Sequence, residues 1–89
     1  MSYQIEISNE AAREIKKLPG YVRAEVRRLV RELGDNPYPP PARELQGKPG
    51  IYRLWVAGRW RMVYAIDDEA LIVTIRRVRS KATIDYASA

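Results

Sequence analysis

The chain has 89 residues, 46% of them hydrophobic and 30% charged, and its formal net charge at pH 7 is +5. These values exclude a disordered chain and a protein with two separate cores, so we expect one folded domain over residues 1–89. Because cysteine and histidine are absent and no phosphate-binding glycine loop is present, we expect no metal and no small-molecule cofactor. No apolar run reaches signal-peptide or membrane-spanning length, which predicts a cytoplasmic protein without a membrane partner.

The N-terminal region predicts a strand followed by a helix. Residues 3–7 alternate between apolar and polar side chains, which is the period of a half-buried strand. Ser8 or Asn9 can cap the helix that follows, and residues 10–18 carry apolar side chains at helical spacing.

A second helix is predicted over residues 21–33, again from apolar side chains at helical spacing. The break at residues 19–20, Pro and Gly, makes the two helices an antiparallel hairpin, and Gly34 is the expected stop of the second helix. Residues 35–50 hold five of the six prolines, so they are expected to form a loop rather than a helix or a central strand.

The remaining residues predict three strands, at 51–57, 60–66 and 70–79. If residues 57–59 form a three-residue turn, Val56 lies opposite Trp60, and the apolar side chains of both strands share one face. Trp55 then lies opposite Arg61 on the other face. The predicted fold is a single small α+β domain of order βααβββ, an antiparallel sheet with two N-terminal helices packed on one face. The first strand is expected to run parallel to one of the C-terminal strands.

The cationic residues concentrate in the predicted sheet. Residues 45–89 hold eight basic and four acidic residues, and three of the acids are consecutive in one turn, which leaves the strands cationic. This distribution favours a polyanionic partner. Arginine forks suit the phosphate group of RNA cleaved by its own 2′-hydroxyl, a neighbouring lysine can exchange a proton, and aromatic rings can stack on unpaired bases.

The order of these elements resembles the RelE/ParE toxin superfamily. The central hairpin of that family reads YRLR-G-YRVIY, and residues 52–64 here read YRLWVAGRWRMVY. Residues 73–79 resemble the family's last strand, and Asp35, Asn36 and Pro37 resemble its D-N-P loop. RelE-type members are toxins of toxin–antitoxin pairs that enter the ribosomal A site and cleave messenger RNA without a metal.

The resemblance implies a catalytic set and an RNA-binding set. The catalytic set is Arg53, Arg61, Lys81 and Tyr86, with Arg61 bracing the scissile phosphate. The RNA-binding set is Lys48, Trp55, Arg59, Arg76, Arg77 and Arg79. Trp55 stands where active relatives have a basic residue, and Arg77 and Arg79 compete with Lys81 for the role of the basic residue after the last strand. The resemblance also implies a cognate antitoxin, expected to be acidic and partly helical.

Two other functions fit the same fold. A ParE-type toxin inhibits DNA gyrase by binding it and has no catalytic chemistry, and an inactive relative only binds an antitoxin or RNA. The basic stripe of Arg23, Arg27 and Arg31 on the second helix is interpreted as a solvated face.

Overall fold

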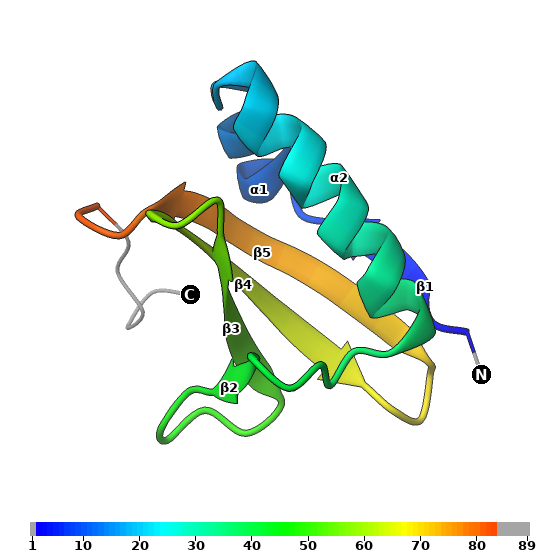
Figure 1. The fold of residues 1–89 in the computed structure, drawn as a ribbon. Helices are drawn as coiled ribbons and strands as arrows, with labels where there is room; N and C mark the ends of the chain where they lie inside the picture. The colour runs from blue at the N-terminus through cyan, green and yellow to red at the C-terminus, as the bar shows by residue number, and fades with distance from the viewer. Residues whose placement is uncertain (1, 84–89) are drawn as a thin grey trace.

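Two helices cover one face of a five-stranded sheet in the computed structural model, which describes residues 2–83 (Figure 1). The elements are β1 (Gln4–Ile7), α1 (Asn9–Lys16), α2 (Gly20–Asp35), β2 (Arg43–Glu44), β3 (Ile51–Val56), β4 (Trp60–Asp67) and β5 (Ile72–Ser80). The strand order is β1-β5-β4-β3-β2, with β1 parallel to β5 and the other pairs antiparallel. The predicted α+β class and the parallel first strand are confirmed. None of the helices in the described residues is long and apolar enough to cross a membrane.

The first helix begins at a side-chain cap. The Ser8 hydroxyl oxygen accepts a hydrogen bond from the Ala11 backbone N–H at 3.1 Å, so Ser8 rather than Asn9 is the cap. The same hydroxyl donates to the backbone carbonyl of Arg76. The cap therefore fixes the start of α1 against β5 as well as satisfying the helix.

The end of α2 differs from the prediction. The helix continues through Gly34 to Asp35, and Gly34 is not among the residues with positive φ. Asn36 follows with φ −147° and ψ 102°, the extended conformation that a residue before proline prefers. Pro37 rather than Gly34 therefore ends the helix.

The register of the central hairpin is confirmed. Val56 lies opposite Trp60, Leu54 opposite Met62 and Trp55 opposite Arg61. The turn between the strands contains Ala57 and Gly58, both with positive φ. Apolar side chains on one face select this register because a one-residue slip would expose all of them.

The sequence did not reveal strand β2, which lies within the predicted loop. It has only two residues and forms the edge of the sheet, with Arg43 opposite Arg53 and Glu44 opposite Tyr52. A segment this short has no measurable periodicity, so only its pairing with β3 identifies it.

β5 contains a bulge between Ile75 and Arg77. Tyr64 lies opposite Ile75 and Val63 opposite Arg77, so Arg76 has no partner in β4. The extra residue keeps Ile75 and Val78 on the same face although they are three positions apart. Both side chains are fully buried against the helices.

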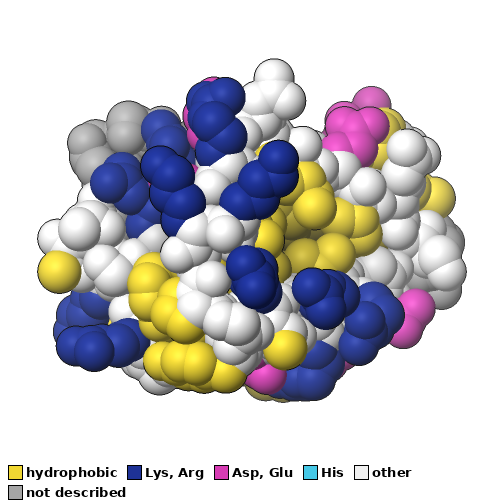
Figure 2. All heavy atoms as spheres, turned by 90° about the horizontal axis from the view of Figure 1, so that it is seen from above, with side chains coloured by type: hydrophobic (Ala, Val, Ile, Leu, Met, Phe, Trp, Pro, Cys, Tyr) yellow, Lys and Arg dark blue, Asp and Glu magenta, His cyan; other side chains and the backbone are white. Residues whose placement is uncertain are grey.

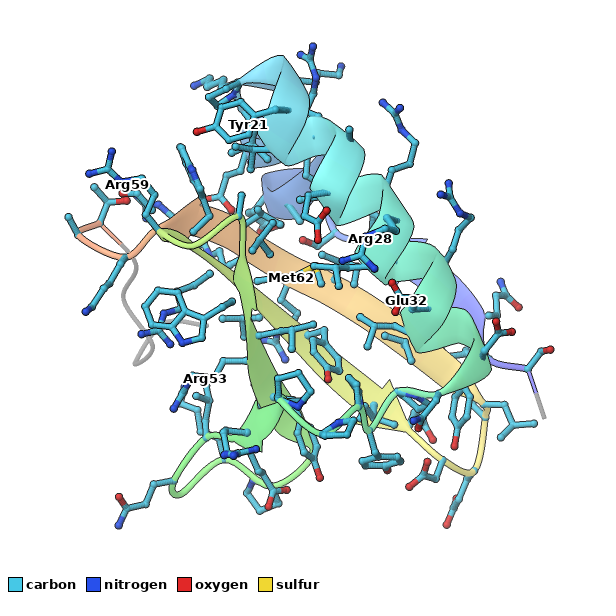
Figure 3. The ribbon with its side chains drawn as sticks, in the orientation of Figure 1. Tyr21, Arg28, Glu32, Arg53, Arg59 and Met62 are labelled. Carbon is cyan, nitrogen blue, oxygen red and sulfur yellow. The ribbon has the colours of Figure 1, made fainter. Side chains whose placement is uncertain are left out.

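The core lies between the helices and one face of the sheet. It consists of Ala11, Leu18, Val22, Val26, Leu33, Leu54, Val56, Met62, Tyr64, Val73, Ile75 and Val78. Figure 3 shows Met62 pointing from the sheet toward α2. Burial is the main cause that raises the pKa of Tyr64, so its phenol stays protonated and donates to the Pro37 carbonyl at 2.9 Å. The core face is therefore the one predicted from the hairpin register.

Asp68, in the turn between β4 and β5, joins three distant segments. Its carboxylate accepts hydrogen bonds from the Tyr38 hydroxyl at 2.6 Å and the Tyr3 hydroxyl at 2.7 Å. Tyr38 in turn packs edge-on against Tyr52, whose ring stacks on Tyr64. The bonds from Tyr38 and then Tyr3 lower the pKa of Asp68 below its usual value. The Asp68 carboxylate therefore stabilises the fold in its charged form.

We expect Asp68→Asn to lower the melting temperature at neutral pH, because asparagine keeps an acceptor oxygen and loses the charge. The folded pKa lies below the unfolded value of about 4, so the stabilisation is complete above that value. It disappears as the pH falls through the folded pKa. Thermal unfolding of both proteins between neutral and strongly acidic pH should show their melting temperatures converging in acid. A difference that stays constant across this range would contradict the role of the charge.

Candidate functional site

The face of the sheet away from the helices, here called the helix-free face, carries most of the predicted site residues. Strand alternation places Arg53 and Trp55 of β3 and Arg61 and Val63 of β4 on this face. Figure 3 shows Arg53 on the side of β3 that points away from α2. The prediction that arginines and an indole share this face is confirmed by the strand register.

Arg61 is more enclosed than a residue presented on an open sheet surface. Its guanidinium carbon lies 3.1 Å from the centroid of the Trp55 ring, and the residue is 9% exposed. Trp55 is 38% exposed. The sequence showed that the two residues lie opposite each other, whereas the structure shows that the indole covers the guanidinium. Such a stack lowers the dielectric around the cation and fixes its orientation.

Lys81 lies at the same indole. Its ammonium nitrogen is 5.4 Å from the Trp55 ring centroid, and its backbone N–H donates to the Arg59 carbonyl at 2.9 Å. The second contact ties the residue after β5 to the turn between β3 and β4. Arg61, Trp55 and Lys81 therefore form one group, here called the indole cluster.

Arg77 and Arg79 bind elsewhere. Arg77 Nη1 lies 3.4 Å and Arg79 Nε 3.3 Å from the same oxygen of Glu14, which belongs to α1. Both arginines competed with Lys81 in the sequence analysis. Arg79 lies opposite Arg61 in register, but Lys81 is the residue of the three whose cationic group lies at the Trp55 ring.

The other predicted residues are spread over the molecule. Arg59 is exposed in the β3–β4 turn, beside an open depression of about 630 Å³ that Lys81 also lines (Figure 3). Lys48 lies in the loop between β2 and β3, and Arg76 is exposed at the bulge of β5. Tyr86 lies outside the described residues.

Two residues near the site were missed by the sequence analysis. Arg43 lies opposite Arg53, and its guanidinium donates to the Pro40 and Ala42 carbonyls. Glu14 is one of several charged residues on a predicted helix, and no pattern distinguishes it from the others. Its position beside β5 depends on packing between segments 63 to 65 residues apart, so no local signal could have identified it.

The helix side of the molecule has a separate cationic surface. Ile7, Ile15, Val26 and Val30 line an apolar hollow of about 160 Å³ together with Arg23 and Arg27. Figure 2 shows apolar side chains in this region with lysine and arginine side chains around them. Two of the acids of α2, Glu25 and Glu32, pair with Arg28 rather than with the predicted stripe, whose three arginines are exposed.

The indole cluster has the features of an anion site. Within residues 2–83, no carboxylate pairs with Arg61, and its buried Nε has no hydrogen-bond partner. Buried donors are nearly always satisfied in folded proteins, so an unpaired guanidinium donor suits an anionic ligand. The described part of the chain also has no group of three His, Cys, Asp or Glu side chains that could hold a metal.

Comparison with known proteins identifies the family. A family model described as the ParE toxin of the type II toxin–antitoxin system parDE matches residues 5–84. The chain belongs to this toxin family. A RelE-like toxin protein from Escherichia coli is 29% identical over 86 residues, covering 96% of this chain and 90% of that protein. The predicted membership of the RelE/ParE superfamily is confirmed.

Solved structures of RelE toxins share the fold. The toxin–antitoxin complex RelBE2 of Mycobacterium tuberculosis contains a chain with a TM-score of 0.78 and 28% identity, covering 91% of this chain and all of that one. A mutant of the E. coli toxin RelE in the free state gives a TM-score of 0.79 at 26% identity, covering 93% of this chain and 88% of that one. This toxin therefore has the RelE-like fold, with a parallel β1 and two helices on one face.

Proposed function

We propose that this toxin is a ribosome-dependent endoribonuclease that cleaves messenger RNA in the ribosomal A site without a metal ion, and so inhibits translation in the cytoplasm. The observation that carries the proposal is the indole cluster, in which the Arg61 guanidinium stacks on Trp55 with its Nε unpaired and Lys81 close by. The likeness to RelE toxins in sequence and fold supports it.

The proposed reaction uses the RNA's own 2′-hydroxyl as the nucleophile. The 2′-hydroxyl gives its proton to water and its oxygen attacks the phosphorus, and the bond to the 5′-oxygen of the next nucleotide breaks. The products are a 2′,3′-cyclic phosphate and a 5′-hydroxyl, so neither a metal nor an added reactant is required. Negative charge grows on the phosphorane oxygens in the transition state, where a fixed guanidinium stabilises it most.

Each member of the indole cluster has a proposed role. Arg61 braces the phosphorane, and Lys81 gives a proton to the departing 5′-oxygen. Trp55 holds Arg61 in place, and its exposed part offers a stacking surface to an unpaired base. Arg53, two residues before Trp55, and Arg59, two residues before Arg61, bind the phosphates that flank the scissile one. Lys48 and Arg76 are proposed to bind phosphates farther along the RNA. Tyr86 remains a proposed member of the catalytic set.

The proposed protein partner is an acidic, partly helical antitoxin. RelE toxins with the same fold were solved in complex with RelB antitoxins from M. tuberculosis and E. coli. The hollow on the helix side, with an apolar floor and Arg23 and Arg27 at its margin, has the chemistry to receive such a segment. It lies on the opposite side of the sheet from the indole cluster.

The alternative function is inhibition of DNA gyrase, which the ParE description of the matching family model favours. Gyrase inhibition needs a protein-binding surface and no catalytic residues. Neutralising Arg61 or Lys81 would leave a ParE-type activity in place, whereas it would remove RNA cleavage. An inactive relative would show neither activity and would only bind its partner.

We expect purified toxin from which metal ions have been removed to cut messenger RNA on programmed ribosomes, because the reaction needs no metal ion bound to the protein. Primer extension locates the cuts, and naked RNA serves as the control for dependence on the ribosome. A parallel assay of gyrase supercoiling tests the alternative. Intact messenger RNA together with inhibited gyrase would reject the nuclease proposal.

A further inference from the structure

Glu14 occupies the place where the sheet lacks a strand. β1 pairs with β5 only over residues 72–75, and the Ser8 backbone N–H then donates to the Ile75 carbonyl at 2.9 Å. Beyond that point no strand pairs with the outer edge of β5 in the described chain. The backbone N–H of Val78 donates instead to Oε1 of Glu14 at 3.0 Å. One oxygen of the carboxylate therefore substitutes for a strand partner.

The other oxygen of Glu14 determines where two arginines lie. Arg77 and Arg79 lie opposite Val63 and Arg61 in register, which would direct them over the helix-free face. Both guanidinium groups instead reach Oε2 of Glu14, whose other oxygen binds Val78 in the plane of the strand. The two cations are thereby placed at the outer edge of β5 and not over the centre of the face.

The contact is partly shielded from solvent. The Glu14 side chain is 19% exposed and that of Arg77 is 27% exposed, whereas that of Arg79 is 39% exposed. Water and salt screen such a group less than they screen a surface ion pair. The carboxylate has three separate contacts, with Arg77, with Arg79 and with the Val78 N–H, and together they define its position.

We propose that Glu14 is a positioning residue that holds Arg77 and Arg79 at the edge of β5 and so limits the cations that RNA meets to those around the indole cluster. The proposal rests on RNA being the ligand of the helix-free face. Each arginine released onto that face would add a phosphate contact that does not depend on the base sequence of the RNA. Glu14 therefore favours recognition by the cluster over diffuse electrostatic binding.

The test is the salt dependence of RNA binding by Glu14→Gln in the full-length protein. Glutamine keeps an oxygen that can accept from Val78 and loses the charge that pairs the arginines. The dissociation constant for a short unstructured oligoribonucleotide is measured over a series of NaCl concentrations. Each additional phosphate contact steepens the plot of log affinity against log salt by about 0.7, so we expect a change of about 0.7 to 1.4. A residue with only a structural role would not change this slope.

The matched control removes the two arginines. Adding Arg77→Ala and Arg79→Ala to Glu14→Gln should return the slope to the wild-type value. An unchanged slope in Glu14→Gln overturns the inference while RNA binding itself stands. Absence of oligoribonucleotide binding by both the wild type and Glu14→Gln also overturns the inference, whereas the proposed function is tested separately by cleavage on programmed ribosomes.

A measurement on the wild type avoids any effect of the substitution on folding. In NMR spectra of the arginine Nε–Hε groups, the signals of Arg77 and Arg79 should stay in place when the oligoribonucleotide is added, and the signal of Arg61 should shift. A large shift of the Arg79 signal would show that the arginine leaves Glu14 for RNA, and would overturn the proposal.

Discussion

Arg61→Ala is expected to slow cleavage of messenger RNA on programmed ribosomes by about 10² to 10³-fold, equivalent to about 3 to 4 kcal/mol of transition-state stabilisation. The loss is large because Arg61 is 9% exposed and stacked on Trp55, so its charge acts in a site with little screening and a fixed geometry. Binding of uncleaved RNA should fall far less, since the phosphorane forms only in the transition state. Single-turnover cleavage rates and equilibrium binding, measured on the same protein, separate the two effects.

The matched control for Arg61→Ala is Arg27→Ala, which removes the same formal charge. Arg27 lines the hollow between α2 and β1 on the helix side of the sheet. Its loss should change the cleavage rate little, and both variants should retain the wild-type fold by circular dichroism. Equal and small losses for the two variants would mean that the arginines act only as diffuse charge, and would reject the catalytic role of Arg61.

Lys81→Ala is expected to slow cleavage by about 10² to 10⁴-fold, the usual effect of removing a general acid. A substrate with sulfur in place of the departing 5′-oxygen gives a sharper test. A thiolate is a far weaker base than an alkoxide and leaves without a proton, so Lys81→Ala should cleave this RNA at nearly the wild-type rate. Arg61→Ala should stay slow on both substrates, because the phosphorane still forms.

Arg79→Ala is the control for Lys81→Ala, because the Arg79 guanidinium contacts Glu14 rather than Trp55. Arg79→Ala should change the cleavage rate little on either substrate. A loss as large as that of Lys81→Ala, or a failure of the sulfur substrate to restore the rate of Lys81→Ala, would show that Lys81 is not the proton donor.

The sequence was sufficient for the sheet faces and the register because strand periodicity carries that information directly. The apolar side chains of β3 and β4 occupy alternate positions, and only one pairing of the hairpin buries all of them. The same argument placed the helices on that face, since both helices have a single apolar stripe. The predicted end of α2 was wrong by two residues. A glycine allows a helix to end but does not require it, whereas Pro37 disfavours the helical conformation of the residue before it.

The composition of the candidate site was also available from the sequence, although its arrangement was not. The pairing of Trp55 with Arg61 follows from the register, but whether the indole covers the guanidinium depends on side-chain rotamers that no pattern reports. The choice among Arg77, Arg79 and Lys81 depended on a carboxylate from the first helix. Periodicity states which face of the sheet a residue occupies and gives no information about which helix side chain it contacts.

The sequence by itself therefore determined the fold class, the core face and the cationic character of the sheet, because each is a sum of local preferences repeated along the chain. Only the tertiary structure decided which cations act together. Packing of α1 against β5 brings Glu14 within reach of Arg77 and Arg79, and the turn at Arg59 brings Lys81 to Trp55. Each of these contacts joins two segments that are far apart in the sequence. A contact that occurs only once produces no repeating pattern from which it could be predicted.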